Sequence, residues 1–150
     1  MTGPSPVDRG KAGSKIHVLT DAKGLPLQTA VSAANTWDGH GLKPLVLAVP
    51  KTKSRRGPRR SRPAKLHADK AYDSSEMRQW LRELGITPRI ARKGVERGDR
   101  LGKHRWVVER TIAWTLNYRR LAVRWERHDH LYAAFLTLAA TLTCFKKLTT

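Results

Sequence analysis

The sequence predicts a mixed α/β domain in which strands and helices alternate along the chain. Its 150 residues suffice for one domain with a hydrophobic core, and 39% of them are hydrophobic. Residues 14–33 alternate apolar and polar positions with a period of two, whereas residues 74–84 and 105–121 carry apolar side chains at helical spacing. We therefore expect a single domain spanning residues 1–150.

The first elements are a pair of strands and a short apolar segment. Apolar and polar residues alternate in "SKIHVLTD" (14–21) and again in "LPLQTAVSA" (25–33), around the turn "AKG". This pattern predicts a β-hairpin. Asp38 is suited to begin the next helix, but Pro44, inside the apolar run 42–49, suits only a first helical turn.

The chain as a whole is strongly basic, and its middle holds a dense run of cations. Over the 150 residues, Lys and Arg number 30 against 12 Asp and Glu, which gives a formal net charge of +18 and favours a nucleic-acid partner. Residues 51–65 hold eight cations and no acid, and Gly57, Pro58 and Pro63 favour an exposed, flexible loop. A solvated linker is the alternative to a loop that follows DNA phosphates. With a second basic loop, "RKGVERGDRLGKH", the predicted DNA-binding residues are Lys51, Lys53, Arg55, Arg56, Arg59, Arg60, Arg62, Arg92, Lys93 and Lys103.

The second half predicts two short strands and three helices. "KLHA" (65–68) and "ITPRIA" (86–91) are strand candidates on either side of the helix 74–84. Helices over 105–121 and over about 131–147 follow.

Two aspartates, Asp69 and Asp73, stand four residues apart in "LHADKAYDSSE". With Asp73 as N-cap, Glu76 falls at the third helical position, and together they predict a capping box for the helix 74–84. Asp69 has no such role, because it follows a short strand at the carboxyl end, where α/β sheets place their sites. A surface salt bridge is the alternative for Asp69.

A third acid, Glu109, lies in "HRWVVERT" on the predicted helix 105–121. An ion pair on the helix surface with Arg105 is the simple explanation. The functional alternative is a metal-binding carboxylate set in a basic surface, as phosphoryl transfer on DNA requires.

Composition also limits where the protein acts. The single cysteine, Cys144, excludes an internal disulfide and a cysteine zinc cluster. The first residues contain no secretory signal, and the apolar run 131–145 is shorter than a membrane span of roughly 18 residues. We expect a packed helix there, no membrane partner and a cytoplasmic protein.

Three ordered blocks of the sequence resemble a known family. They are "GPSPVDRGKAGSKIHVLTDAKGLPLQTAVSAANTWD" (3–38), "LHADKAYDSSEMRQWLRELGITPRIARKG" (66–94) and "LGKHRWVVERTIAWTLNYRRLAVRWE" (101–126). They are similar to the C-terminal part of the catalytic domain of DDE transposases of bacterial insertion sequences, the insertion sequence 5 type. The resemblance covers nearly the whole chain and implies an RNase H-like mixed sheet with flanking helices.

The resemblance also implies a site. The family uses Asp, Asp and Glu to hold two Mg²⁺ (or Mn²⁺) ions; "ADKAYD" matches the second acid, hence Asp69, and "RWVVER" matches the third, hence Glu109, with Arg105 in an Arg-x-x-x-Glu arrangement. Related groups have a Tyr where Gly102 stands and a cation where Leu116 stands. The supporting cations expected in their place are Arg119 and Arg120, about three helical turns after Glu109.

The family's first acid lies on a first strand upstream of the matched region. That strand is central in an RNase H-like sheet, so we expect an incomplete sheet in which the hairpin and the Asp69 strand lose their shared neighbour. Asp8 and Asp21 are the acids left in the first part of the chain, in an irregular segment and at a turn. We expect a fragment or second-frame product whose upstream partner supplies the first Asp.

Three functions follow as hypotheses. The first is the catalytic segment of a transposase that cuts element ends and joins them to target DNA, as a homo-oligomer when active and inactive alone. The second is a non-catalytic DNA-binding fragment or regulator. The third is an unrelated basic RNA- or DNA-binding protein. The five tryptophans do not favour single-strand binding, because they are scattered and stand mostly at helical positions suited to core packing.

Overall fold

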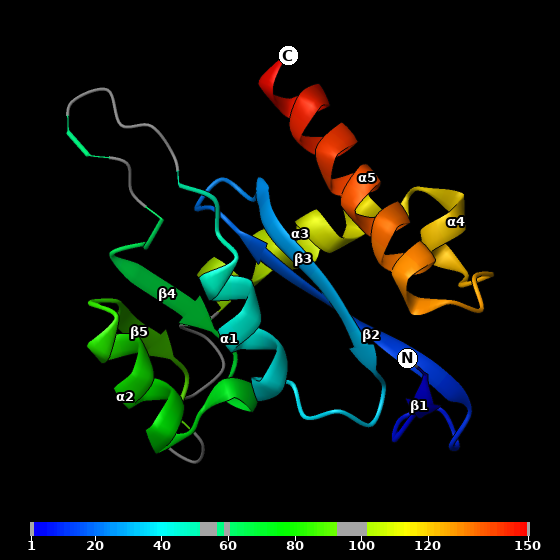
Figure 1. Cartoon of the computed structure of the whole chain (residues 1–150), viewed down its shortest axis with the longest axis horizontal. Coiled ribbons are helices and arrows are strands. Elements are labelled where there is room, and N and C mark those ends of the chain that lie inside the picture. Colours follow the sequence, from blue (N-terminus) through cyan, green and yellow to red (C-terminus); the bar gives the residue numbers. More distant parts are fainter. Residues whose placement is uncertain (1, 52–56, 59–60, 93–101, 150) are drawn as a thin grey trace.

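The computed structural model describes residues 2–51, 57–58, 61–92 and 102–149, and the side chains of residues 102–105 are not described. Two small sheets and several helices make up this part of the chain (Figure 1). The elements in order are β1 (Gly3–Pro4), β2 (Ala12–Thr20), β3 (Pro26–Ala33), α1 (Gly39–Leu47), β4 (Lys65–Ala68), the 3₁₀ turn η1 (Lys70–Tyr72), α2 (Ser75–Glu83), β5 (Thr87–Ile90), α3 (Gly102–Leu116), α4 (Arg119–Ala122) and α5 (Asp129–Leu148).

The predicted hairpin is confirmed. β2 and β3 are antiparallel neighbours, with Ile16 opposite Val31, and β1 extends the sheet by pairing with Ala12 and Gly13 of β2. At the turn, Asp21 Oδ1 accepts hydrogen bonds from the backbone N–H groups of Lys23 and Leu25, both at 2.8 Å. Asp21 is therefore a turn residue, as its position in the sequence predicted.

Helix α1 begins directly after Asp38, as predicted, but Pro44 lies in its interior instead of its first turn. The proline removes one backbone donor from the helix. Burial offsets this loss, because Leu42 and Val46 enter a core cluster with Leu66 of β4. Asp38 makes no side-chain cap and instead receives a hydrogen bond from Lys15 Nζ at 2.9 Å.

The segment around Asp69 forms a β4–α2–β5 unit. β4 and β5 are parallel, with Leu66 opposite Pro88, and α2 joins them. Both strands and α2 confirm the elements that the sequence predicts. The face of α2 that carries Met77 and Leu81 is buried against Ile90, which closes one hydrophobic core of the molecule.

The C-terminal half differs from the expected pattern of two helices. The helix expected over 105–121 is divided, because Tyr118 has extended backbone angles between α3 and α4 (φ −76°, ψ 115°). α5 lies along β3 (Figure 1), and its Tyr132 and Leu136 are buried in a second core cluster with Leu121 of α4. Tyr132 Oη donates to the carbonyl of Leu121 at 3.1 Å, which holds the short α4 in place.

Helix α5 is longer than the apolar run in the sequence. It spans 20 residues, and among the described helices it is long and apolar enough, by length and composition, to cross a membrane. In this fold 28% of its most apolar window is buried, and its buried side chains pack on β3 and α4. These contacts are those of the packed helix that the sequence predicts.

The two sheets are separate. The three-stranded sheet has the order β1-β2-β3, and β4 pairs only with β5 among the described strands. On the edge of β2 opposite β3, pairing is limited to Ala12 and Gly13, so residues 15–20 have no strand neighbour there within the described chain. The mixed α/β class is therefore confirmed, with strands divided between two sheets.

Candidate metal and DNA site

A cavity of about 680 Å³ lies between the two sheets. Thr20 at the end of β2 lines it, as do Leu66 and His67 of β4 and Val107 and Val108 of α3. His67 precedes Asp69 by two residues, and Val108 precedes Glu109 by one. β4, which leads into Asp69, and α3, which carries Glu109, therefore both border one cavity, although neither acid itself lines it.

Asp69 lies at the carboxyl end of β4, as expected, but it also has a local structural role. It is the N-cap of η1, and its Oδ1 accepts a hydrogen bond from the Lys70 N–H at 2.6 Å. This backbone contact replaces the surface salt bridge as the structural explanation of Asp69. It also fixes the orientation of the carboxylate, which a metal ligand requires as well.

Asp38 and Asp69 both act electrostatically on Tyr72, which the sequence did not predict. Burial raises the pKa of the Tyr72 hydroxyl, and the negative charges of Asp38 and Asp69 raise it further. Because both carboxylates act on one phenol, α1 and η1 must lie close together, and the two elements do make contact. Asp38 thus lies near Tyr72, and its own carboxylate is paired with Lys15.

The predicted capping box of α2 is wrong. The N-cap is Ser74, whose Oγ accepts a hydrogen bond from the Met77 N–H at 3.1 Å. Ser74 is suited to this position because its hydroxyl reaches the backbone with extended angles (φ −141°, ψ 151°). Asp73 instead precedes the cap and binds Arg78, and Glu76 binds Lys43 Nζ at 2.5 Å.

Glu109 lies on α3 with an exposed side chain. Arg105 is on the same helix, and its side chain lies outside the described part of the structure. The position of α3 is secured nearby, because Thr111 Oγ1 donates to the carbonyl of Gly24 at 2.6 Å and Arg110 Nη2 donates to the carbonyl of Lys23 at 2.7 Å. The turn of the hairpin thus fixes the helix that carries Glu109.

The expected alignment of Arg119 and Arg120 with Glu109 is wrong. Both residues lie on α4, beyond the break at Tyr118, so no continuous helix carries them in line with Glu109. Arg120 binds Glu126 Oε1 through Nε at 3.1 Å and Nη2 at 2.9 Å, and its guanidinium lies 4.8 Å from the Phe135 ring centroid. Arg120 therefore has a packing role between α4 and α5.

The structure describes only three of the predicted DNA-binding cations with their side chains. Lys51, Arg62 and Arg92 are exposed, and Arg62 Nη1 donates to the carbonyl of Leu84 at 3.4 Å. The other members lie outside the described residues or have undescribed side chains: Lys53, Arg55, Arg56, Arg59, Arg60, Lys93 and Lys103. The expected loop 51–65 is described at residues 51, 57–58 and 61–65.

The two remaining acids in the first part of the chain both have structural partners. Asp8 lies 3.9 Å from Lys11 Nζ in an exposed ion pair, and Asp21 holds the hairpin turn. Asp21 also lines the cavity between the sheets. Neither contact makes these residues an evident replacement for a third ligand.

The sequence analysis did not predict the cation–π contacts that Arg110 makes with two tryptophan rings along α3. The guanidinium carbon of Arg110 lies 4.3 Å from the Trp106 ring centroid and 4.6 Å from that of Trp114. The i, i+4, i+8 spacing of these three residues places them on one side of the helix, and this spacing was the available signal.

The donor set fits a divalent cation in part. Mg²⁺ prefers oxygen ligands and is commonly held by one or two carboxylates together with substrate phosphates. Asp69 and Glu109 offer such oxygens. Among the described residues, however, no group of three or more His, Cys, Asp or Glu side chains could hold a metal ion. Joint binding of a metal ion by Asp69 and Glu109 therefore stays a prediction.

Comparison with known proteins identifies the family. Residues 2–144 match the model of the transposase DDE domain. A Burkholderia cepacia protein named as a transposase for insertion sequence element IS402 is 46% identical over 147 residues, which are 98% of this chain and 70% of that protein. A Neisseria meningitidis serogroup B protein named as the transposase for insertion sequence element IS1106 is 31% identical over 145 residues, 85% of this chain and 46% of that protein.

No solved structure matches the chain. The family model and the first relative nevertheless cover almost all of it, and they confirm the resemblance carried by the three sequence blocks. The chain belongs to the DDE transposases of insertion sequences.

Proposed function

We propose that this protein is the C-terminal catalytic segment of a DNA transposase, which cleaves the ends of an insertion sequence and transfers them to target DNA. The observation that carries this proposal is the shared cavity: β4, which leads into Asp69, and α3, which holds Glu109, form two of its walls. Membership of the DDE family supports it independently, and it leaves the third hypothesis, an unrelated nucleic-acid binder, without support.

In this proposal Asp69 and Glu109 hold Mg²⁺ or Mn²⁺, which would activate the attacking oxygen and stabilise the leaving oxygen of the phosphodiester. The Lys70 N–H keeps the Asp69 carboxylate in one orientation at the end of β4. The exposed Lys51, Arg62 and Arg92 would bind DNA phosphates around the site. Arg105, beside Glu109 in sequence, is proposed to support the same site.

The test is a strand-cleavage and strand-joining assay with duplex DNA that carries the element ends. The purified chain is assayed alone and with the polypeptide encoded upstream, with Mg²⁺, Mn²⁺ or a chelator. We expect metal-dependent products only when the upstream polypeptide is present, and their loss in Asp69→Asn and Glu109→Gln. Metal-independent activity, or equal activity in both variants, would refute the proposed ligands.

A second candidate function is a non-catalytic DNA-binding fragment that occupies element ends. One observation favours it: among the described residues, no cluster of at least three metal-ligating side chains is present. This candidate predicts tight, salt-dependent DNA binding with no cleavage products under any metal or partner condition. The same assay, with DNA binding measured in parallel, therefore separates the two functions.

We also propose that the sheet is incomplete and that another polypeptide completes it. On the edge of β2 opposite β3, residues 15–20 pair with no other strand in the described part of the chain. β4 pairs only with β5 among the described strands, and the cavity lies between β2 and β4. Two strand edges that flank an apolar space favour an inserted strand, because its N–H and C=O groups would pair on both sides. An Asp on that strand would supply the family's first acid.

Hydrogen exchange tests this completion. The probe is the unmatched remainder of the IS402-named relative, expressed as a separate polypeptide, because the chain covers 70% of that protein. We expect it to slow amide exchange in residues 15–20 and 65–68, while exchange in α5 stays unchanged. Binding without protection at both strands would contradict insertion between them.

The proposal includes a cytoplasmic location and a homo-oligomeric active form, the latter measured by light scattering of the DNA complex.

A further inference from the structure

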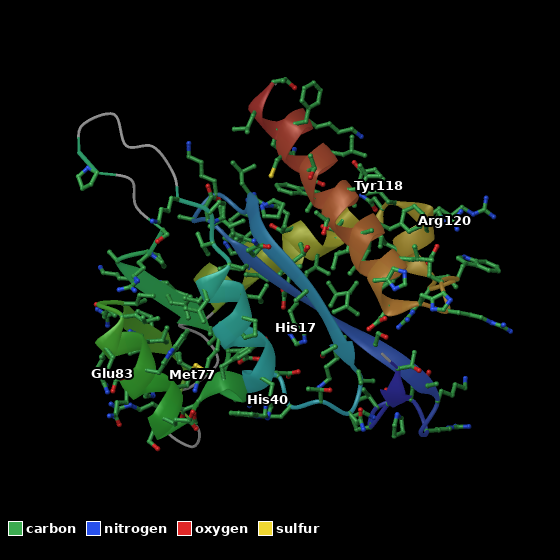
Figure 2. The ribbon with its side chains drawn as sticks, in the orientation of Figure 1. His17, His40, Met77, Glu83, Tyr118 and Arg120 are labelled. Atoms are coloured by element: carbon green, nitrogen blue, oxygen red, sulfur yellow. The ribbon has the colours of Figure 1, made fainter. Side chains whose placement is uncertain are left out.

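Helix α5 has a second apolar face, which the described part of the chain leaves exposed. Its buried side chains pack toward β3 and α4, and Tyr118 and Arg120, labelled in Figure 2, mark this packed side. A helix turns by about 100° per residue, so the opposite side carries a separate set of side chains. We call this exposed set the outer α5 face: Leu131, Ala134, Leu138, Thr141, Leu142, Phe145 and Leu148.

The outer α5 face is large and uncharged. Phe145 is 65% exposed and Leu148 is 71% exposed. No charged residue occurs between positions 131 and 145. Lys146 and Lys147, which follow, lie over the rings of Tyr118 and Trp114 on the packed side of the helix, so neither belongs to the outer face. A contiguous apolar surface of this kind indicates an interaction site.

The polar member of the face can be buried at little cost. Thr141 Oγ1 donates to the carbonyl of Thr137, one helical turn earlier, at 2.9 Å. The hydroxyl proton is therefore bonded within the helix, and a partner that covers Thr141 leaves no donor unsatisfied.

The face repeats at the spacing of a coiled coil. Successive intervals of three and four residues separate the members that form its central line, which are Leu131, Ala134, Leu138, Thr141, Phe145 and Leu148. These intervals correspond to positions a and d of successive heptads, whose side chains fit between those of another helix. The occupant that this spacing favours is therefore a helix.

The face fits a second copy of itself in the antiparallel direction. The facing pairs are then Leu131 with Leu148, Ala134 with Phe145, and Leu138 with Thr141. Two of the three pairs place a large side chain against a small one, which lets the layers interdigitate. A parallel pair would instead place Phe145 against Phe145 and Ala134 against Ala134, so that one layer is overfilled and another is left empty.

We propose that the outer α5 face binds the same face of a second copy of this chain, as an antiparallel helix pair with its two-fold axis beside Leu138 and Thr141. The inference rests on the proposed function, whose active form is a homo-oligomer, and it names the surface that joins two copies. A standard interface covers about 800 Å² of each partner, which is more than one face of a 20-residue helix offers. The dimer should therefore be weak and concentration-dependent.

Two other occupants compete for the face. A membrane is one, because α5 is long and apolar enough to cross it, but the opposite side of the helix already packs on β3 and α4. A further segment of a longer protein is the other, because the chain covers 70% of the IS402-named relative. Neither occupant accounts for the match of the face to its own reverse.

Sedimentation velocity tests the association of the full chain without DNA or metal. Protein at about 1 to about 100 µM is measured in about 0.15 M salt, which screens the repulsion between two basic chains. Leu138→Glu brings two carboxylates together beside the axis and should raise the dimer dissociation constant at least about tenfold. Leu47→Glu is the matched control, because Leu47 is a 66% exposed leucine at the end of α1, and it should leave the constant unchanged.

Disulfide cross-linking tests the direction of the helix pair with milder substitutions. The background is Cys144→Ser, since Cys144 is the single cysteine. A mixture of Leu138→Cys and Thr141→Cys chains should form a dimer that joins the two variants. Leu131→Cys alone should not cross-link, because antiparallel pairing separates the two copies of this residue by about 25 Å along the helix.

A wild-type dimer that Leu138→Glu weakens and Leu47→Glu does not, together with the Leu138–Thr141 cross-link, supports the interface. A chain that stays monomeric, equal effects of the two Glu variants, or cross-linking of Leu131→Cys overturns it. Loss of the dimer on addition of phosphatidylcholine vesicles, or of the unmatched remainder of the IS402-named relative, also overturns it and assigns the face to that occupant. The strand-cleavage assay decides the proposed function separately, and circular dichroism confirms that each variant is folded.

Discussion

Arg78 joins the start of α2 to the end of β5. Its Nε donates to Asp73 Oδ1 at 2.7 Å, and its Nη2 donates to the carbonyl of Ile90 at 2.8 Å. The two side chains of the ion pair are only 15% and 17% exposed. Asp73, which the sequence suggested as a helix cap, therefore acts through a partly buried ion pair that connects two elements.

Removal of this ion pair should destabilise the fold. Asp73→Ala leaves the Arg78 guanidinium partly buried without its carboxylate, and we expect a loss of roughly 1.5–3 kcal/mol in the free energy of unfolding. Urea denaturation measures it. Asp8→Ala is the control, because the Asp8–Lys11 pair is exposed and its atoms are 3.9 Å apart. Equal losses in the two variants would show that the partly buried Asp73–Arg78 ion pair stabilises the fold no more than the exposed Asp8–Lys11 pair does.

The cap of α2 can be located by substitution. Ser74→Ala removes the acceptor for the Met77 N–H, and a loss of about 1 kcal/mol is expected. Ser75→Ala, one residue later at an exposed helical position, should be neutral or slightly stabilising. Thermal and urea unfolding of both variants would reveal the difference, and a larger loss in Ser75→Ala would place the cap elsewhere.

The contact between the hairpin turn and α3 depends on a glycine. Gly24 has φ +86°, and a Cβ there would lie 2.9 Å from Thr111 Oγ1. Gly10 has a similar φ of +76°, but nothing lies within 4 Å of its added Cβ. Both Gly→Ala variants should lose about 1–2 kcal/mol from backbone strain, and Gly24→Ala at least about 1 kcal/mol more from overpacking. Denaturant unfolding that gives equal losses would argue against close packing of the turn on α3.

Stability should fall in mild acid because of His17. Burial lowers the pKa of this imidazole; the negative charge of Asp38 opposes the shift and the positive charge of Lys15 adds to it. Its usual value is 6.5, so the unfolded chain binds the proton first as the pH falls. The contribution of His17 is full above that value and declines as the pH falls through it toward the lower folded pKa.

His17→Gln tests this pH dependence, since an amide can retain the contact of His17 Nε2 with Ser32 Oγ, 2.7 Å apart. Urea midpoints between about pH 7.5 and about pH 5.5 should decline more in the wild-type chain than in the variant. An identical decline in both would assign the effect to other groups.

Metal binding should be visible without catalysis. Mn²⁺ should raise the melting temperature of the wild-type chain with its upstream partner, because a ligand of the folded state stabilises it. Asp69→Asn should abolish the increase but unfold at nearly the same temperature without metal, since Asn Oδ1 can still accept from the Lys70 N–H. An unchanged metal effect in Asp69→Asn would remove Asp69 from the ligand set.

Local patterns were sufficient for most elements. The hairpin, β4, α2 and β5 lie where periodicity and turn residues predict them, because each depends on neighbours in sequence. The break at Tyr118 had no such signal: Leu121 packs under Tyr132 of α5, and that contact replaces the last turns of the expected helix. The cap was misplaced by one residue because Asp73 and Ser74 both suit an N-cap, and Arg78 decides between them.

The sequence by itself determined the family and the basic character, and it predicted Asp69 and Glu109 as the acids of the site, since these depend on residue types at set spacings. Only the tertiary structure decided which contacts the cations make: Arg120 is bound to Glu126, whereas Lys147 and Arg110 both lie near the Trp114 ring. It also decided that the strands form two sheets around a cavity. The cavity between the sheets and the Lys147–Trp114 contact join residues far apart in the chain, and local sequence patterns do not specify which distant segments pack together.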